Sequence, residues 1–303
     1  MRTYVNPVFD HVAPDPSVVR DPSGVFWCYT TMTYYRRKRL WVPVLRSEDL
    51  VDWRFVGDAL PRLPPWGRRA SWAPHIERVG DRYVLFLSIE DRATGTMQLG
   101  VATCDRPEGP FEPEPDRLID AEHERIDANL LTREDGARFL VWSEENAVKV
   151  APTADDGVHP AEPGTTVLLP IGEEGTGYDS VVEGPWMIER EGRVYLFTSG
   201  DVCCMYADPH YAVAVSRSAS PLDPFERFAD NPILESTDGA FVAPGHCAIV
   251  RDDAGADWML YHAMRSRRLG PRVMLLDRVD WEDGWPRVGR PSSESRPAPV
   301  VSA

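Results

Sequence analysis

The sequence predicts an all-β protein that folds as a five-bladed β-propeller. One short phrase recurs five times at a nearly constant interval, and each interval is long enough for four short strands. No segment shows convincing helical periodicity, and the chain contains 28 prolines in 303 residues. We therefore expect residues 1–303 to form a single five-bladed propeller domain.

The recurring phrase consists of a glycine, two further residues, an aromatic residue and an apolar run. Its glycines are Gly24, Gly80, Gly136, Gly192 and Gly255. The first four are 56 residues apart in turn, and the fifth follows 63 residues later. Glycine permits a left-handed turn, and β-branched and aromatic residues favour strands, so each phrase predicts a β-hairpin.

A further strand is predicted downstream of four of these phrases, at 40–46, 97–103, 211–216 and 273–279. Polar turns rich in Pro, Asp and Gly follow, as in 106–110 and 220–224. Four short strands joined by such turns make one propeller blade.

The repeat also aligns polar residues that are far apart in the chain. The residues nine positions before the five glycines are Asp15, Ser71, Asp127, Glu183 and His246. The first strand of each blade lines the central channel of a propeller, so equivalent positions on these strands form a ring. We therefore predict that these five side chains surround one pocket.

Burying three carboxylates beside apolar runs costs free energy, so such residues usually have a charged or hydrogen-bonding partner or a function. One alternative is that they form ion pairs with Arg20, Arg125 or Arg272, or bond to backbone at blade edges. Two carboxyls that flank a glycosidic bond can instead act as acid and base, and a third can raise the pKa of the acid by repulsion. A metal cluster is a third use, but no local D-x-D or H-x-x-x-H pattern supports it.

An ordered set of short motifs carries a family resemblance along nearly the whole chain. The motifs are Asp15-Pro16-Ser17, Trp72-Ala73-Pro74, Ile126-Asp127, Glu183-Gly184-Pro185, Pro244-Gly245-His246 and 280–286. In these motifs the sequence resembles glycoside hydrolase family 43, which includes arabinanases, arabinofuranosidases and β-xylosidases. The resemblance implies that Asp15 is the general base and Glu183 the general acid of an inverting reaction. It also implies that Asp127 tunes the pKa of the acid and orients it.

The resemblance suggests further residues for the site. His246 would lie in the channel, where some members hold calcium or another ion, so it is a possible metal ligand; no other cofactor is expected. Arg272 matches an arginine that reaches the sugar in many exo-acting members. Trp72 is a candidate sugar platform, since an aromatic face packs against sugar C–H groups, with a core position as the alternative. Ala128 stands where members usually carry proline after the tuning aspartate, which suggests a different backbone placement there.

Composition limits the partners of the protein. Its 48 acidic and 33 basic residues give a formal net charge of −15, which repels phosphate backbones and anionic lipid. We therefore expect neither nucleic acid nor a membrane surface as a partner. The polar segment Met1–Asp10 and the absence of a long apolar run predict a cytoplasmic protein.

Two local features allow alternative interpretations. The five cysteines are expected to be reduced, and the adjacent Cys203 and Cys204 are interpreted as core residues, with a site-lining role as the alternative. The basic run Tyr34-Tyr35-Arg36-Arg37-Lys38-Arg39 is interpreted as a solvated hairpin tip, although a loop on the site face could bring it near a substrate.

The expected function is that of an inverting, exo-acting glycosidase on short oligosaccharides or small glycosides. An α-L-arabinofuranosidase or β-xylosidase is favoured, with endo-arabinanase or galactofuranosidase as alternatives. Related retaining fructan hydrolases usually carry Glu-Cys-Pro where this chain has Glu183-Gly184-Pro185, which counts against them. A non-hydrolytic sugar-binding propeller, or one recruited to another reaction, is the alternative from a different class. The presence of all three acids favours a hydrolase.

Overall fold

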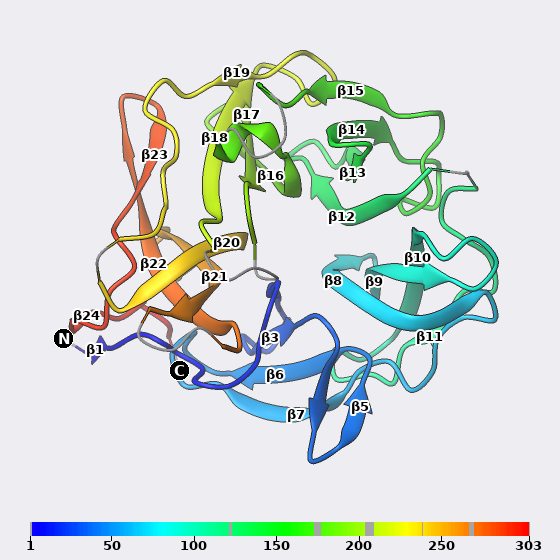
Figure 1. Cartoon of the computed structure of the whole chain (residues 1–303), viewed down its shortest axis with the longest axis horizontal. Helices are drawn as coiled ribbons and strands as arrows, with labels where there is room; N and C mark the ends of the chain where they lie inside the picture. The colour runs from blue at the N-terminus through cyan, green and yellow to red at the C-terminus, as the bar shows by residue number, and fades with distance from the viewer. Residues whose placement is uncertain are drawn as a thin grey trace.

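Five antiparallel sheets of four strands surround a central axis in the computed structural model (Figure 1). The structure describes residues 2–120, 123–172, 177–203, 209–237, 239–266 and 270–302. Within these ranges the helical structure is the single 3-10 turn η1 (Tyr178–Ser180). The predicted all-β, five-bladed propeller is confirmed.

Each blade is a meander in which consecutive strands pair. Its innermost strand is its first, because β2, β8, β12, β16 and β20 contact one another around the axis. Blade 1 contains β2 (Ser17–Arg20), β3 (Phe26–Tyr29), β6 (Pro43–Ser47) and β7 (Arg54–Asp58). Blade 2 contains β8 (Gly67–Val79), β9 (Arg82–Asp91), β10 (Met97–Cys104) and β11 (Glu112–Pro113). Blade 3 contains β12 (Arg125–Thr132), β13 (Arg138–Glu144), β14 (Ala147–Pro152) and β15 (Thr165–Leu168).

Blade 4 contains β16 (Glu183–Arg190), β17 (Arg193–Gly200), β18 (Ala212–Ser218) and β19 (Glu226–Arg227). Blade 5 contains β20 (Phe241–Arg251), β21 (Asp257–Arg265), β22 (Val273–Glu282) and β23 (Trp285–Val288). A separate hairpin, β4 (Thr33–Tyr35) with β5 (Lys38–Leu40), leaves blade 1 between β3 and β6. The four predicted downstream strands correspond to β6, β10, β18 and β22, and β14 is the third-blade counterpart that the sequence did not predict.

The hydrophobic core lies between neighbouring blades. One cluster joins Phe197 of blade 4 to Tyr261 of blade 5, and a second joins Leu260 of blade 5 to Phe26 of blade 1. Three more clusters fill the spaces between blades 1 and 2, 2 and 3, and 3 and 4. Each sheet thus packs apolar side chains on both faces.

The two ends of the chain meet at blade 5. β1 (Thr3–Tyr4) pairs with β24 (Arg296–Pro297), and Phe9 forms a bridge with Met274 of β22. The Asn6 amide donates to the Leu276 carbonyl at 3.0 Å and accepts from the Leu276 N–H at 2.9 Å. These contacts hold the segment before blade 1 against blade 5 and so close the ring. Among the described residues no helix is long and apolar enough to cross a membrane, and the cytoplasmic location stays a prediction.

The five repeat glycines all have positive φ, as the turn signal predicts. The turns themselves are of two kinds. In blades 1, 3 and 5 the first two strands are joined by five residues, as between Arg20 and Phe26, and the glycine is the fourth of them. In blades 2 and 4 the joining turn has two residues, with Gly80 first in one and Gly192 second in the other. A fixed offset from the glycine therefore reaches different positions in the two kinds of blade.

Candidate active site

In β8, β12, β16 and β20 two residues bulge out of the pairing with the second strand, and the first residues of these bulges are Ala73, Asp127, Gly184 and His246. Their counterpart in blade 1 is Asp15, which lies two residues before β2, and all five residues have positive φ. We call these five the bulge residues. They are the structurally equivalent positions, which corrects two members of the predicted ring. Ser71 lies two residues before its bulge residue and Glu183 one residue before, because blades 2 and 4 have the shorter turns.

A side chain from the preceding blade accepts the backbone N–H of each bulge residue. The N–H of Ala73 donates to Thr31 Oγ1 at 2.6 Å, and that of Asp127 donates to Ser88 Oγ at 2.9 Å. The N–H of His246 donates to Ser199 Oγ at 2.8 Å, and that of Asp15 donates to His262 Nδ1 at 3.2 Å. A positive φ outside glycine costs on the order of 1–2 kcal/mol, so such bonds help to fix a strained backbone at the ring. The Gly184 N–H follows the same pattern and donates to the Asp127 carboxylate of blade 3 at 2.9 Å.

Asp15 is buried among donors and cations. Its carboxylate accepts from Thr31 Oγ1 at 2.6 Å and from the Arg272 guanidinium at 2.8 Å, and His246 Nδ1 lies 3.7 Å away. Burial acts to raise the pKa of Asp15, but Arg272 and then His246 and His262 outweigh it and hold this pKa well below 3.8. Asp15 is therefore an ionised carboxylate, which can accept a proton from water.

The ion-pair alternative holds for one of the three arginines considered. Arg272 pairs with Asp15, whereas Arg20 pairs with Asp253 and Arg125 with Glu144, both away from the three acids. Asp127 and Glu183 have no ion-pair partner among the described residues. The resemblance places Arg272 on the sugar, and the structure places it on the proposed base.

Asp127 and Glu183 form an interacting pair of buried carboxyls. Burial, together with the Glu183 charge, raises the pKa of Asp127 well above 3.8, although the Gly184 N–H opposes this. Burial likewise raises the pKa of Glu183 above 4.5; the Tyr211 hydrogen bond opposes this rise and the charge of Asp15 adds to it. The two groups therefore titrate together and retain a proton at a pH where solvated carboxyls have lost theirs. A retained proton is what a general acid needs.

Two residues of the site were not found from the sequence. Tyr211 is buried, donates its hydroxyl to Glu183 Oε1 at 2.6 Å and stacks on His262 with a centroid distance of 5.9 Å. His262 Nδ1 lies 3.2 Å from the Asp15 backbone N and 3.1 Å from Asp15 Oδ1, and burial lowers the pKa of His262 to about 4. A Cβ on Gly245 would lie 2.0 Å from the Tyr211 ring, so glycine is needed there, but no pattern in the sequence connects these two residues.

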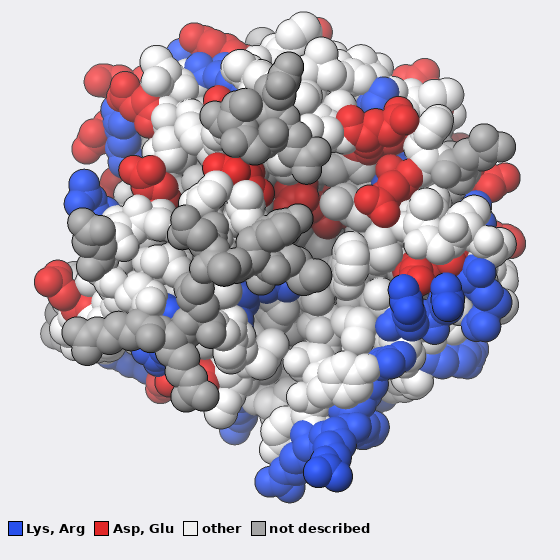
Figure 2. Space-filling model, viewed as in Figure 1, with Lys and Arg blue, Asp and Glu red and all other residues white. Residues whose placement is uncertain are grey.

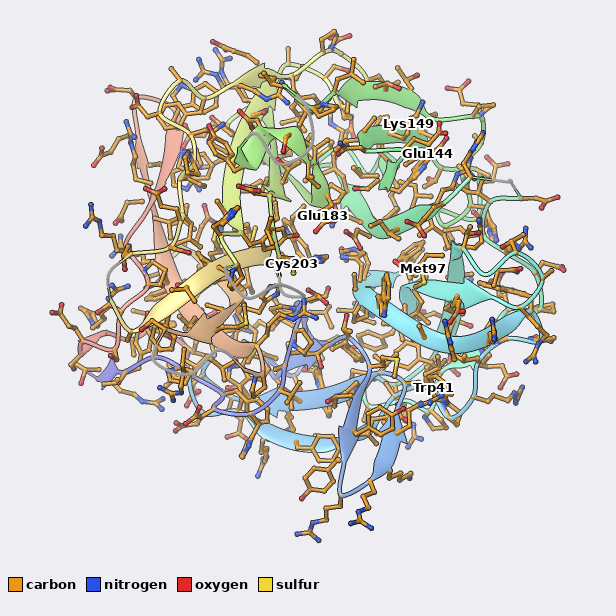
Figure 3. The ribbon with its side chains drawn as sticks, viewed as in Figure 1. Trp41, Met97, Glu144, Lys149, Glu183 and Cys203 are labelled. Carbon is orange, nitrogen blue, oxygen red and sulfur yellow. The ribbon has the colours of Figure 1, made fainter. Side chains whose placement is uncertain are left out.

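The remaining predicted residues lie around the same opening. Trp72 is 44% exposed and precedes its bulge residue by one position, as Glu183 does, so the core alternative for Trp72 is wrong. Cys203 is partly buried against the cluster that contains Tyr211, and its sulfur also lies 3.8 Å from Arg272 near the central opening (Figure 3), so it borders both the core and the site. Cys204 lies outside the described residues. Ala128 is buried and forms the second residue of the Asp127 bulge.

His246 does lie in the ring, and its imidazole is next to Gly184. A Cβ added to Gly184 would lie 3.0 Å from His246 Nδ1. Its nearest carboxylate, Asp15, already accepts from the cationic Arg272. Among the described residues no group of three His, Cys, Asp or Glu side chains is arranged to hold a metal ion. These side chains therefore do not fit a cation chelated by protein ligands next to His246.

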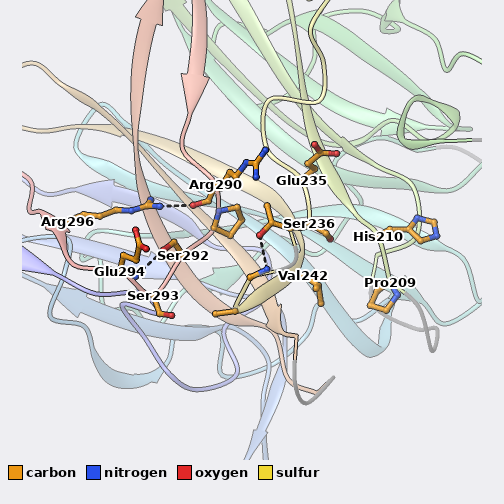
Figure 4. A pocket seen from close by; sticks show the side chains of 14 residues that line it. Pro209, His210, Glu235, Ser236, Val242, Arg290, Ser292, Ser293, Glu294 and Arg296 are labelled. Atoms are coloured by element: carbon orange, nitrogen blue, oxygen red, sulfur yellow. Dashed lines mark hydrogen bonds between the residues drawn. The ribbon is translucent and has the colours of Figure 1, made fainter.

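A cavity of about 930 Å³ lies apart from the acids. It is bordered by residues around Ser236 and Val242 and by the segment 290–296, where Arg296 donates to the Arg290 carbonyl (Figure 4). None of the bulge residues lines it. Cavity size therefore does not locate the chemistry, whereas the buried carboxyls do.

One ionised carboxylate facing a proton-retaining pair, in the channel of a five-bladed propeller, defines the class of acid–base glycoside hydrolases. The sequence pattern of Glycosyl hydrolases family 43 matches residues 4–286. The chain belongs to this family.

Individual relatives agree with this assignment. The chain is 28% identical to the non-reducing end α-L-arabinofuranosidase of Bacteroides ovatus, over 95% of this chain and 54% of that protein. It is also 28% identical to the β-D-galactofuranosidase of Aspergillus niger, over 90% of this chain and 81% of that protein. The chain thus spans about half the length of the first relative and most of the second. The crystal structure of a thermostable family-43 glycoside hydrolase superposes with a TM-score of 0.86 at 25% identity, covering 99% of this chain and all of that one.

Proposed function

We propose that this protein is an exo-acting, inverting hydrolase that releases a terminal L-arabinofuranosyl or D-xylosyl residue from short oligosaccharides or small glycosides. The observation that carries the proposal is the contrast between its carboxyls. Cations hold Asp15 ionised, while Asp127 and Glu183 retain a proton. A base and an acid thus lie together in the central channel at the same pH.

In the proposed mechanism Glu183 protonates the oxygen of the leaving group. Asp15 removes a proton from a water that attacks the opposite face of the sugar ring, which inverts the anomeric carbon. Asp127 titrates as a coupled pair with Glu183 and so tunes the pKa of the acid, and it accepts the Gly184 N–H, which fixes the backbone next to the acid. Arg272 orients Asp15, and the exposed face of Trp72 packs on the sugar. These side chains and one water suffice, with no metal or cofactor.

The choice of sugar rests on the relatives and on Arg272. An arabinofuranosidase and a galactofuranosidase are equally similar to the chain, so a terminal galactofuranosyl residue is the second candidate. Exo action is proposed because Arg272, the counterpart of an arginine in many exo-acting members, stands next to the proposed base.

The test is hydrolysis of the nitrophenyl glycosides of arabinofuranose, xylose and galactofuranose, with Glu183→Gln as the inactive control. Proton NMR of the first-formed sugar should show the configuration opposite to that of the substrate. The carboxyls of Asp15 and Glu183 should then stand about 6.5–9.5 Å apart, which leaves room for the water. Failure to hydrolyse any substrate faster than Glu183→Gln would favour a sugar-binding propeller instead. Retained configuration would overturn the roles given to Asp15 and Glu183.

A further inference from the structure

We propose that the β4–β5 hairpin and the adjoining start of β8 bind a carboxylate-bearing sugar, a uronate, in the leaving group of the substrate. The location of the cleaved bond in this proposal rests on the proposed function. The uronate surface, as we name it, comprises Tyr34 to Arg39 with Arg68 and Arg69.

The hairpin starts at the edge of the site. Thr31, whose hydroxyl bonds to Asp15, is followed by Met32, whose N–H donates to the Ser71 carbonyl at 3.0 Å next to Trp72. β4 begins at Thr33, and the hairpin turns at Arg36 and Arg37. Three residues of strand extend about 10 Å, so the turn stands roughly that far beyond Thr33. The hairpin therefore rises from the rim of the site next to Asp15.

The hairpin carries unpaired positive charge on an acidic protein. Arg36, Arg37 and Lys38 are exposed, and no carboxylate of the described residues forms an ion pair with them or with Arg39. Arg39 instead donates to the Tyr34 hydroxyl at 2.7 Å. Most other arginines pair with carboxylates despite the net charge of −15. Figure 2 shows Lys and Arg gathered over this hairpin and over the neighbouring part of blade 2.

The start of β8 extends the positive surface towards Trp72. The side chains of Arg68 and Arg69 are 49% and 66% exposed, and both approach the single buried carboxylate of Glu90, at 3.5 and 2.6 Å. Two guanidiniums on one carboxylate leave a surplus positive charge. Trp72 follows three residues after Arg69 on the same strand, so cations and an exposed aromatic face stand in sequence beside the site.

Exposed aromatic rings complete a surface suited to a sugar. Tyr34 and Tyr35 are 58% and 50% exposed, and Tyr35 packs against Phe55 at a centroid distance of 5.4 Å. The hairpin and blade 1 enclose a cavity of about 370 Å³ lined by these rings and Trp53. Aromatic faces bind the C–H face of a sugar, and guanidinium groups bind carboxylate in a bidentate manner.

The overall charge selects the kind of anion. Interactions between surface charges are screened over about 8 Å at physiological ionic strength. A local cluster of cations can therefore attract one or two carboxylates although the net charge of the protein is negative. A nucleic acid or an anionic membrane would extend past the cluster and meet the acidic remainder of the surface. A short acidic oligosaccharide is therefore the favoured ligand.

The experiment compares two substrates with the same terminal sugar, one attached to a uronate-bearing oligosaccharide and one to its carboxyl-reduced counterpart. The variant Arg36→Asn/Arg37→Asn removes two charges at positive φ positions that asparagine tolerates. The matched control is Arg82→Asn/Arg193→Asn. It removes two exposed charges that flank the turns at the ends of β8 and β16.

We expect Arg36→Asn/Arg37→Asn to lower kcat/KM on the uronate substrate about fivefold or more, through KM, because each lost contact is a partly solvated charge pair. Activity on the reduced substrate and on a nitrophenyl glycoside should stay within about twofold of wild type, since neither carries a carboxylate. Added salt should abolish the wild-type preference for the acidic substrate. Equal kcat/KM on both substrates, or equal losses in both variants, would overturn the proposal.

A binding measurement separates failure of this proposal from failure of the proposed function. Calorimetry with tri-galacturonate should show binding to wild type and to Glu183→Gln, and weaker binding to Arg36→Asn/Arg37→Asn. This result would support the surface even if no glycoside is hydrolysed. Tighter binding of a DNA oligonucleotide or of phosphatidylserine vesicles than of tri-galacturonate would refute the choice of ligand.

Discussion

Replacing Glu77 by glutamine should change how the stability of the propeller depends on pH. Glu77 lies on β8 beyond the bulge and is partly buried. It borders a cavity of about 350 Å³ that His75, Asn129 and Trp186 also line. The Arg78 N–H donates to its carboxylate at 3.0 Å, but burial dominates and raises the pKa of Glu77 from 4.5 to about 7.

The sign and size of the effect follow from this shift. A carboxyl with a raised pKa in the folded state contributes its stability below pH 4.5, and this contribution is lost as the pH rises through about 7. A shift of about 2.5 units at 1.36 kcal/mol per unit corresponds to roughly 3 kcal/mol, and solvent access to the carboxylate makes this an upper value. Glu77→Gln cannot ionise and should not show this loss.

The assay is guanidinium denaturation of wild type and Glu77→Gln at about pH 5 and about pH 8. The difference between the two pH values cancels the pH-independent cost of the new amide. Wild type should lose up to roughly 3 kcal/mol more than Glu77→Gln over this interval. The exposed Glu134→Gln is the control and should behave as wild type. An identical pH dependence in wild type and Glu77→Gln would refute the reasoning.

Three further predictions concern the site itself. Asp15→Asn and Glu183→Gln should each lower kcat by about 10²–10⁴ or more with unchanged circular dichroism, since each removes a proton-transfer group; a tenfold loss or less would contradict these roles. Asp127→Asn should move the alkaline limb of the pH–rate profile downward, because the upper pKa of the coupled Asp127–Glu183 pair is lost with one of its two carboxyls, and an unmoved limb in an active variant would exclude tuning. Gly184→Ala places a Cβ 3.0 Å from the His246 ring at φ 55° and should destabilise the fold by about 1–2 kcal/mol, measured by denaturation; wild-type stability would show that the ring tolerates the change.

The sequence alone was sufficient for the blade count and for most of the ring. Turn glycines and strand-forming runs act locally, so their spacing along the chain survives in the fold. Asp15, Asp127 and His246 were placed correctly because blades 1, 3 and 5 share one turn length, which keeps a fixed offset on the same strand position. Glu183 was found one residue from its expected place, still beside the other acids.

Tertiary structure decided the features that depend on contacts between blades. The two-residue turns of blades 2 and 4 shift the register, so that Ala73 rather than Ser71 is the bulge residue. His262 on the second strand of blade 5 reaches Asp15 of blade 1, and Tyr211 just before the third strand of blade 4 reaches Glu183 of the same blade. No constant spacing marks such residues. The contact of His262 forms only once the ring has closed, and that of Tyr211 depends on how the strands of blade 4 are arranged. The ionisation of the three acids depends on the same packing, since burial and the approach of Arg272 determine which carboxyl keeps a proton.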